Sequence, residues 1–194
     1  MILTKLVYED VLSGLVLRKL LSVNSALCLV GTHNKHGFGG IKKHILGYNA
    51  AAEHLPFIVL TDLDTHPCPP DLIKEWGIVN HHRNLIFRIA VHATESWLLA
   101  DREGFAKYLG INPKNIPLSP DSILDPKQKL LSLVEKSRKR DLKEDILPRY
   151  RGDKFGPDYN GRLGDFVQNF WDASKARLSS RSLDKAIKRI EEIR

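Results

Sequence analysis

Acidic side chains follow two apolar segments of this sequence, at the points where β-strands are expected to end. Glu9 comes directly after residues 2–8, and Asp62 and Asp64 come directly after residues 57–61. Residues two apart on an extended segment point the same way, so Asp62 and Asp64 can face one site. Three gathered carboxylates repel one another, by on the order of 4 kcal/mol per pair at a separation of about 4 Å and an effective dielectric constant near 20. A hard divalent cation, Mg²⁺ or Mn²⁺, is the natural counter-charge.

Simpler roles are open to the same residues. Asp10 stands where the N-cap of a helix would stand. An Asp-x-Asp sequence after a strand also occurs in ordinary turns, and Glu9 taken alone is a weak signal. The combination of Glu9, Asp62 and Asp64 at corresponding strand ends is what favours a metal site.

A further acid, Glu95, follows the apolar segment 84–91 and is a candidate to assist a second metal ion. Asp101 lies six residues later, which is not a same-face spacing on a helix, so one helix cannot easily direct both acids to one ion. We therefore favour Glu95 for the site and expect Asp101 to end that helix or to cap the next one.

Strand-like and helix-like segments alternate along the first part of the chain. This order predicts an α/β fold, with a mostly parallel, Rossmann-like central sheet, helices on both faces and a helical C-terminal part. In such sheets ligands bind beyond the carboxyl ends of the strands, where the acids lie. We expect an α/β core over residues 1–110 and a basic, mainly helical extension over 111–194 packed on it. The expected strands are 2–8, 26–30, 57–61 and 84–91, and the expected helices are 11–21, 41–55, 94–100, 127–145, 165–176 and 182–193.

A glycine-rich segment, 37–40, precedes a helix that carries Lys42 and Lys43. Backbone N–H groups at a helix N-terminus suit a phosphate, although glycine-rich turns are also common without one. The segment is neither a Walker A motif nor G-x-G-x-x-G, so the sequence does not support a nucleotide cofactor.

The positive charge is concentrated late in the chain. The sequence has 30 Lys and Arg against 23 Asp and Glu, a net charge of +7, and residues 127–194 hold 18 of the former against 11 of the latter. A solvated helix face is one interpretation; contact with a phosphate backbone is the other. The residues predicted to bind nucleic acid are Lys42, Lys43, Arg138, Lys139, Arg140 and Lys154. Tyr150, Phe155 and Tyr159 lie among the late charges and are able to stack on bases or to pin the loop.

The histidines suggest a different metal, zinc. His33 with His36, and His66 with Cys68, are zinc-ligand types, but they lack the usual paired motifs. His92 is a candidate general base for water, or simply a hydrogen-bonded, half-buried residue.

Composition excludes several classes of protein. Two cysteines make neither a disulfide framework nor a four-cysteine zinc site. No apolar run approaches the roughly 20 residues that a bilayer span needs, so we expect no membrane partner. The first residues lack the pattern of a signal peptide, and we expect a soluble, cytoplasmic protein.

The order strand-Glu, helix, strand, glycine-rich loop, helix, strand-DxD resembles the Toprim domains of topoisomerases, bacterial primases, recombination-repair proteins and OLD-family nucleases. More closely, the chain resembles uncharacterised bacterial Toprim-like proteins found among mobile and phage-defence genes. The resemblance spans nearly the full chain. It lies in Val7–Asp10 (VYED), Gly39-Gly40, Leu60–Asp64 (LTDLD), Glu95–Asp101 (ESWLLAD), Phe166–Trp171 and Ser182-Leu183.

The resemblance implies Mg²⁺ or Mn²⁺ bound by Glu9, Asp62 and Asp64, with Glu95 as a further catalytic acid, and phosphodiester chemistry on nucleic acid. Many Toprim motifs place glycine directly after the first Glu, whereas Asp10 stands there in this chain. A version that only binds or regulates therefore stays open.

The first hypothesis is a Mg²⁺-dependent Toprim-type nuclease of a bacterial defence or mobile-element system, with DNA favoured over RNA. The alternative is a non-catalytic nucleic-acid-binding or regulatory subunit of a partner ATPase, since the chain has no ATP motif of its own. A third hypothesis is a metal-dependent phosphatase acting on a small substrate. If the first is right, we expect the basic helices to lie beside the acidic strand ends.

Overall fold

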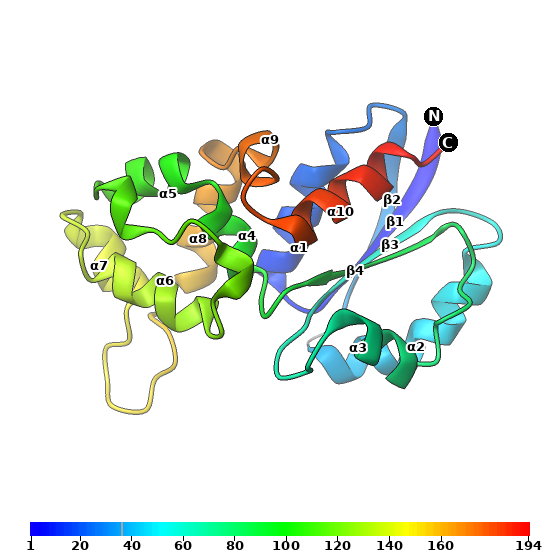
Figure 1. The fold of residues 1–194 in the computed structure, drawn as a ribbon, viewed down its shortest axis with the longest axis horizontal. Helices are drawn as coiled ribbons and strands as arrows, with labels where there is room; N and C mark the ends of the chain where they lie inside the picture. Colours follow the sequence, from blue (N-terminus) through cyan, green and yellow to red (C-terminus); the bar gives the residue numbers. More distant parts are fainter. Residues whose placement is uncertain (36) are drawn as a thin grey trace. The chain divides into compact units, whose positions relative to one another are not determined.

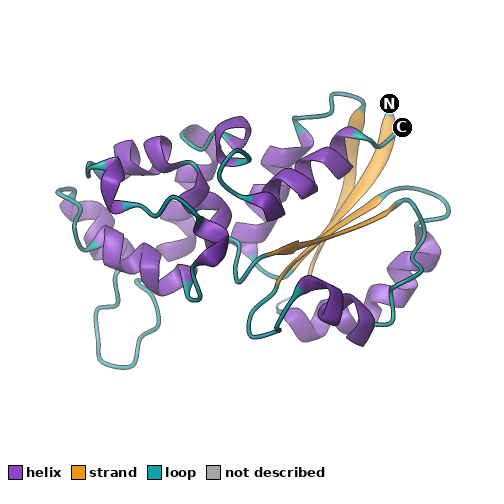
Figure 2. Cartoon of the chain, in the orientation of Figure 1, coloured by secondary structure: helices purple, strands orange, loops and turns teal. Residues whose placement is uncertain are grey.

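The computed structural model describes residues 1–35 and 37–194. These residues form two compact units (Figure 1). Unit 1 contains residues 1–94 and 182–194, and unit 2 contains residues 95–181. The strands lie in unit 1, and unit 2 is built from helices and loops (Figure 2).

Unit 1 is built on a parallel four-stranded sheet in the order β2-β1-β3-β4. The strands are β1 (Ile2–Tyr8), β2 (Leu27–Asn34), β3 (Phe57–Asp62) and β4 (Leu85–Ala90). Every residue of β3 is buried, as expected for a parallel strand that is covered on both faces. The predicted α/β fold with a parallel sheet is confirmed.

Helices cover both faces of this sheet: α1 (Val11–Leu21) and α10 (Arg181–Glu191) lie on one face, and α2 (Phe38–Ala51) and α3 (Pro69–Glu75) on the other (Figure 1). Between the sheet and its helices, apolar side chains form the core of the unit. The cluster around α2 and α3 includes Val7, Ile41, Ile45, Val59, Leu72, Trp76 and Phe87.

The strand order creates a topological switch point at β1 and β3. The chain passes from β1 to β2 on one side, then crosses to β3 on the other side of β1. In open α/β sheets with such a crossing, ligands bind beyond the carboxyl ends of the two central strands. Glu9 directly follows β1, and Asp62 is the last residue of β3.

Unit 2 is helical, as predicted for the late part of the chain. Its helices are α4 (Glu95–Ala100), α5 (Arg102–Leu109), α6 (Pro126–Val134), α7 (Arg140–Ile146), α8 (Tyr159–Asn169) and α9 (Ala173–Ala176), with 3₁₀ turns at Pro113–Asn115 and Pro120–Ser122. Its core is aromatic: Trp97, Phe105, Phe166 and Trp171 are buried, and the Trp171 indole donates to the backbone oxygen of Trp97 at 3.1 Å. Across the described residues, no helix combines the length and apolarity of a membrane span.

The units divide the chain at a different place from the predicted boundary after residue 110. Helices α4 and α5 belong to unit 2, where Phe105 packs edge-on against Phe166 at 4.9 Å. Helix α10 returns to unit 1 because its apolar stripe is buried there, and Asn24 donates to the backbone oxygens of Ile190 and Ile193. The charge is therefore shared: unit 1 holds 13 Lys and Arg against 10 Asp and Glu, and unit 2 holds 17 against 13.

Several expected elements differ in extent. The helix predicted over 41–55 is α2, which begins at Phe38 and ends at Ala51. The helix predicted over 127–145 is two helices, α6 and α7, because the hydroxyl of Ser137 donates to the backbone oxygen of Leu109 and accepts from the Lys139 N–H between them. The strand predicted over 26–30 continues to Asn34, since β1 pairs with it as far as Tyr8.

The helix predicted over 165–176 is also two helices, α8 and α9, because Asp172 donates its N–H to the Asp101 carboxylate and caps α9 with its own carboxylate. None of these changes moves an acidic candidate away from its strand end.

Candidate functional site

Glu9 reaches from the end of β1 to the end of β3. Its Oε1 accepts a hydrogen bond from the backbone N–H of Asp62 at 3.0 Å and a short one from the hydroxyl of Thr61. The two strands are hydrogen-bonded neighbours, so this contact needs no long side chain. The structure thus brings Glu9 and Asp62 together at the switch point, as the sequence predicted.

The pKa of Glu9 lies above its ordinary value of 4.5. Burial of the carboxyl group is the largest cause, because it penalises the charged form. The hydrogen bonds from Thr61 and the Asp62 N–H act in the opposite direction, and the negative charges of Asp64 and Asp10 raise the pKa further. Several acids therefore act on one another at this edge, which is the electrostatic condition that a cation relieves.

Stability is predicted to depend on the charge of Glu9. Because its folded-state pKa is raised, the stability it contributes is present below about pH 4.5 and is lost as the pH rises through the folded-state value. We expect Glu9→Gln to become progressively more stable than the wild type as the pH rises above this range. Urea unfolding of both proteins in EDTA at several pH values measures the difference, and a gap that stays constant with pH contradicts the assignment.

Asp62 is buried, at 5% exposure, and is engaged with Thr94. Its Oδ1 accepts hydrogen bonds from the backbone N–H and the hydroxyl of Thr94, both at 2.8 Å. The Thr94 hydroxyl lies 3.4 Å from that of Ser13, which donates to Asp10. Asp10 also accepts from the Ser13 N–H at 2.8 Å, so its predicted role as the N-cap of α1 is confirmed. Sequence reasoning missed both hydroxyl residues.

Asp64 and His92 adopt a backbone conformation that is uncommon outside glycine. Their φ angles are +50° and +61°, and the Asp64 N–H donates to the backbone oxygen of His92 at 2.9 Å. The backbone bond from Leu63 to Ala90 precedes it, so the pairing of β3 with β4 continues past the strand ends. Such strain often accompanies a functional site, and here it occurs beside Asp62.

The chemistry of the candidate donors fits a hard divalent cation, because they are carboxylates. Among residues 1–35 and 37–194, no three or more His, Cys, Asp or Glu side chains are grouped as metal ligands. The Oδ1 of Asp62 and the Oε1 of Glu9 each accept two hydrogen bonds, and the charge of Asp64 raises the pKa of Glu9. Mg²⁺ commonly takes one or two carboxylates and completes its shell with water. Glu9 and Asp64 fit that pattern.

Glu95, the fourth predicted acid, is the first residue of unit 2 and is only 3% exposed. Its Oε1 accepts a hydrogen bond from the Tyr159 hydroxyl at 2.9 Å. Asp101 caps α5 through the Gly104 N–H and accepts from the Asp172 N–H, which confirms that it is a capping residue. A catalytic role for Glu95 stays a prediction.

The glycine-rich segment has a structural purpose. Helix α2 begins at Phe38, and Gly37 donates its N–H to the backbone oxygen of Glu9 at 3.0 Å. A Cβ on Gly40 would lie 2.3 Å from the backbone oxygen of Lys35, so only glycine fits there. These contacts fix the start of α2 beside Glu9, and phosphate binding at this place stays a prediction.

The two lysines of α2 differ. Lys42 forms an ion pair with Glu75 at 2.6 Å, and Glu75 also contacts His66 at 3.0 Å. Lys43 is exposed. Of the predicted nucleic-acid contacts in unit 1, Lys43 is therefore the better placed to meet a ligand.

The histidines are used locally. His33 packs against the ring of Tyr48 at 5.6 Å, and His36 lies outside the described residues. Cys68 donates to the carboxylate of Asp71 at 3.2 Å. These contacts account for the described members of the zinc-type pairs.

The late basic candidates all lie in unit 2. Arg140 is paired with Glu144 at 2.7 Å, and the Lys139 ammonium stands over the Tyr108 ring at 5.6 Å. Arg138 and Lys154 are exposed. The expectation that these residues lie beside the acidic strand ends relates one unit to the other and stays a prediction.

Comparison with known proteins gives no match for this chain. No protein-family model, curated protein or solved structure matches the chain. The candidate site is therefore defined by this chain's own contacts: Glu9 joined to Asp62 across the two central strands, with Asp64 acting on the charge of Glu9.

Proposed function

We propose that this chain is a Mg²⁺-dependent enzyme, also active with Mn²⁺, that cleaves phosphodiester bonds in nucleic acid. The observation that carries the proposal is the contact of Glu9 with the end of β3 at the topological switch point of a parallel sheet. Open α/β sheets bind their ligands at this place. The raised pKa of Glu9 beside Asp64 supports a site that is completed by a cation.

In this proposal Glu9 and Asp64 hold the ion. A divalent cation held by these residues would supply the activation of water and the stabilisation of the leaving oxygen that cleavage of a phosphodiester needs. Thr61 and the Asp62 N–H orient the Glu9 carboxylate through their hydrogen bonds. Asp62 is a positioning residue, since its own carboxylate fixes Thr94.

Charge supports a nucleic acid as the substrate. Unit 2 carries an excess of cations, including the exposed Arg138 and Lys154, and Lys43 is exposed in unit 1. Cations of this kind bind the phosphate backbone without regard to sequence. DNA is favoured over RNA as this substrate. The resemblance of the chain to Toprim-like proteins implies a role in a bacterial defence or mobile-element system.

A second candidate function is a non-catalytic nucleic-acid-binding or regulatory subunit that acts with a partner ATPase. It is favoured by one observation: the buried carboxylate of Asp62 holds Thr94 through two hydrogen bonds, which is a structural role. In that case binding of nucleic acid needs no metal.

The test is a cleavage assay of the purified chain on single- and double-stranded DNA and RNA, in Mg²⁺, in Mn²⁺ and in EDTA. We expect cleavage of a nucleic acid in Mg²⁺ or Mn²⁺ and none in EDTA. Nucleic-acid binding in EDTA without cleavage in either metal favours the second candidate. Hydrolysis of a small phosphate ester alone would replace the proposal with a phosphatase.

A further inference from the structure

A loop of unit 2, residues 148–158, stands out from the helices on either side of it and is drawn in yellow in Figure 1. Its base is closed by backbone hydrogen bonds from Gly156 to Ile146 and from Asp158 to Asp145, both at 2.9 Å. A Cβ on Gly156 would lie 2.4 Å from the backbone oxygen of Asp145, so glycine is required at this closure. The loop is therefore held at its base.

The tip of the loop is also held, and it presents an aromatic ring to solvent. The Asp153 N–H donates to the backbone oxygen of Tyr150, and the Asp153 carboxylate accepts from the Tyr150 N–H, both at 3.1 Å. Gly152 supplies the left-handed residue of this turn, with φ +107°. Tyr150 is 77% exposed, although an aromatic side chain of this size is usually partly buried.

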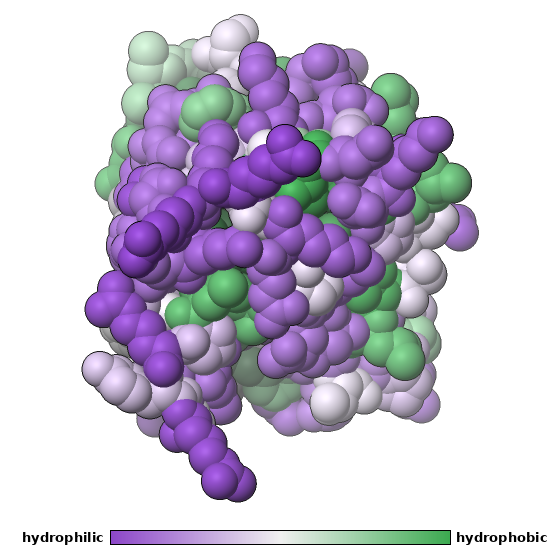
Figure 3. Space-filling model, turned by 90° about the vertical axis from the view of Figure 1, so that its left-hand side faces the viewer, coloured by the Kyte–Doolittle hydropathy of each residue, from purple (hydrophilic) through white to green (hydrophobic). Residues whose placement is uncertain are grey.

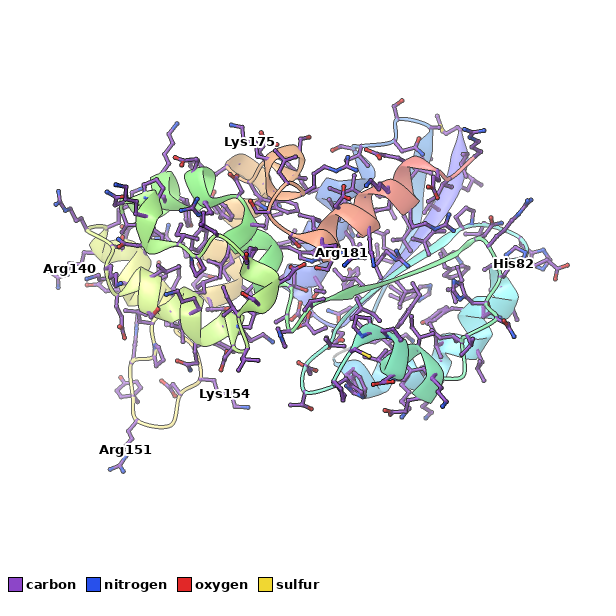
Figure 4. The ribbon with its side chains drawn as sticks, viewed as in Figure 1. His82, Arg140, Arg151, Lys154, Lys175 and Arg181 are labelled. Atoms are coloured by element: carbon purple, nitrogen blue, oxygen red, sulfur yellow. The ribbon has the colours of Figure 1, made fainter. Side chains whose placement is uncertain are left out.

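Cations surround this ring. Residues 149–154 hold Arg149, Arg151 and Lys154 against one carboxylate, that of Asp153. Arg151 extends from the loop into open space (Figure 4), Lys154 lines the pocket beside the loop, and within the described part of the chain neither has an acidic side chain at ion-pair distance. The side of unit 2 that carries α7 is largely hydrophilic, with its apolar side chains scattered (Figure 3). Tyr150 is thus an isolated aromatic among cations rather than part of an apolar docking surface.

A pocket of about 830 Å³ lies between this loop and α6. Leu131, Leu147, Pro148 and Phe155 supply its apolar lining. The Phe155 ring lines the pocket and stacks on Tyr159 with ring centres 4.2 Å apart, a contact that holds the ring in place. The volume falls within the range of about 300–1,000 Å³ that is usual for small-molecule sites.

The charged lining of this pocket carries both signs. The carboxylates of Asp125, Glu135 and Asp153 line it and can accept hydrogen bonds from the amino groups of a base. Lys127 and Lys154 line it as well and, with the other cations of the loop, can attract a phosphate. The arrangement suits a ligand with a flat, amino-bearing ring and an anionic backbone.

From these observations we infer that the 148–158 loop and its pocket bind single-stranded nucleic acid, with one base stacked on Phe155, another on Tyr150, and the backbone on Arg149, Arg151 and Lys154. Unpaired bases expose their ring faces for such stacking, whereas a duplex hides them. This inference rests on the proposed function, since it names the form of nucleic acid that the enzyme takes.

The test measures binding of the full chain in EDTA, so that cleavage plays no part. Fluorescence anisotropy with a labelled DNA strand of about 15 nucleotides, and with its duplex, gives the two affinities. We expect the single strand to bind at least about 10-fold more tightly than the duplex, and Tyr150→Ala to weaken binding of the single strand by about 5- to 100-fold. Tyr150→Phe keeps the ring and is expected to bind as the wild type does.

Two further variants separate stacking from charge. Phe155→Ala is expected to weaken binding by a similar factor, and Lys154→Gln to reduce the slope of log affinity against log salt by about 0.7. Lys175, which is exposed in α9 of the same unit and paired with Asp172, supplies the control Lys175→Gln, with little expected effect. Equal binding of duplex and single strand, or full affinity in Tyr150→Ala, overturns the inference.

Failure of this inference can be distinguished from failure of the proposed function. Ring-dependent binding of the single strand in EDTA without cleavage in Mg²⁺ or Mn²⁺ supports the loop site and removes the nuclease. Metal-dependent cleavage with full affinity in Tyr150→Ala keeps the nuclease and removes the loop site.

Discussion

Glu9→Gln is expected to lower the rate of divalent-cation-dependent cleavage by at least about 100-fold, since changes to residues that only support metal ligands already cost about 10- to 100-fold. The amide keeps an oxygen that can accept from Thr61 and from the Asp62 N–H, so the fold is retained. It removes the negative charge, which is the property that a hard cation requires. Cleavage rates at saturating substrate, measured in Mg²⁺ and in Mn²⁺, give the ratio.

Matched variants show whether this loss is specific. Asp64→Asn is expected to reproduce it, because Asp64 is the second acid in the proposed cation site. Glu53→Gln removes an exposed charge between the end of α2 and the start of β3, away from the carboxyl ends of the strands. This variant is expected to cleave as the wild type does. Equal loss in Glu53→Gln, or full activity in Glu9→Gln, is incompatible with the proposed role.

Asp62→Ala is expected to lower the free energy of unfolding by about 2–5 kcal/mol, because two buried donors of Thr94 lose their acceptor and each unsatisfied group costs about 1–3 kcal/mol. Thr94 is 2% exposed, so water cannot readily replace the lost carboxylate. Asp62→Asn keeps an acceptor oxygen and is expected to lose about half as much, since a neutral hydrogen bond is weaker than a charged one.

Urea unfolding followed by circular dichroism measures both changes. The slope of the unfolding free energy against urea concentration should be the same in all three proteins, which shows that they expose the same amount of surface on unfolding. The order expected for stability is wild type, then Asp62→Asn, then Asp62→Ala. If Asp62→Ala is as stable as the wild type, the carboxylate does not hold Thr94 in place, and the positioning role of Asp62 is wrong.

Several features of the site could be predicted because they depend on nearby sequence. Strand ends are marked by a change from apolar to acidic residues, which located Glu9 and Asp62 correctly. Capping depends on a side chain and the next three residues, so Asp10 and Asp101 were assigned to helix N-termini. The grouping of Glu9 and Asp62 requires β1 and β3 to be neighbours, and the sheet order β2-β1-β3-β4 meets this condition.

Other features could not be predicted because they depend on pairs of residues far apart in sequence. The Thr94 hydroxyl lies near that of Ser13 across 81 positions and donates to Asp62 across 32, and no local pattern marks such partners. The commitment of Asp62 to Thr94 therefore appeared only in the structure. Lys42 similarly finds Glu75 across 33 positions.

The return of α10 to the sheet is a further example. The spacing of Leu183, Ala186, Ile187 and Ile190 marks an apolar stripe on this helix, but the spacing does not say which surface the stripe covers. The contacts with Asn24 and with Arg88, which donates to the backbone oxygen of Lys185 at 3.3 Å, place it in unit 1. The basic extension expected after residue 110 is for this reason divided between the two units.

The central claim is that Glu9 and Asp64 form a site for a divalent cation, and calorimetric titration of Mn²⁺ into the wild type and Glu9→Gln tests it most directly. We expect one Mn²⁺ site per wild-type chain. The affinity of Glu9→Gln for Mn²⁺ should be lower by at least about 10-fold, because a charged ligand is lost. Glu53→Gln is expected to match the wild type. Equal Mn²⁺ affinity in the wild type and Glu9→Gln, or no Mn²⁺ binding by the wild type, would contradict the claim.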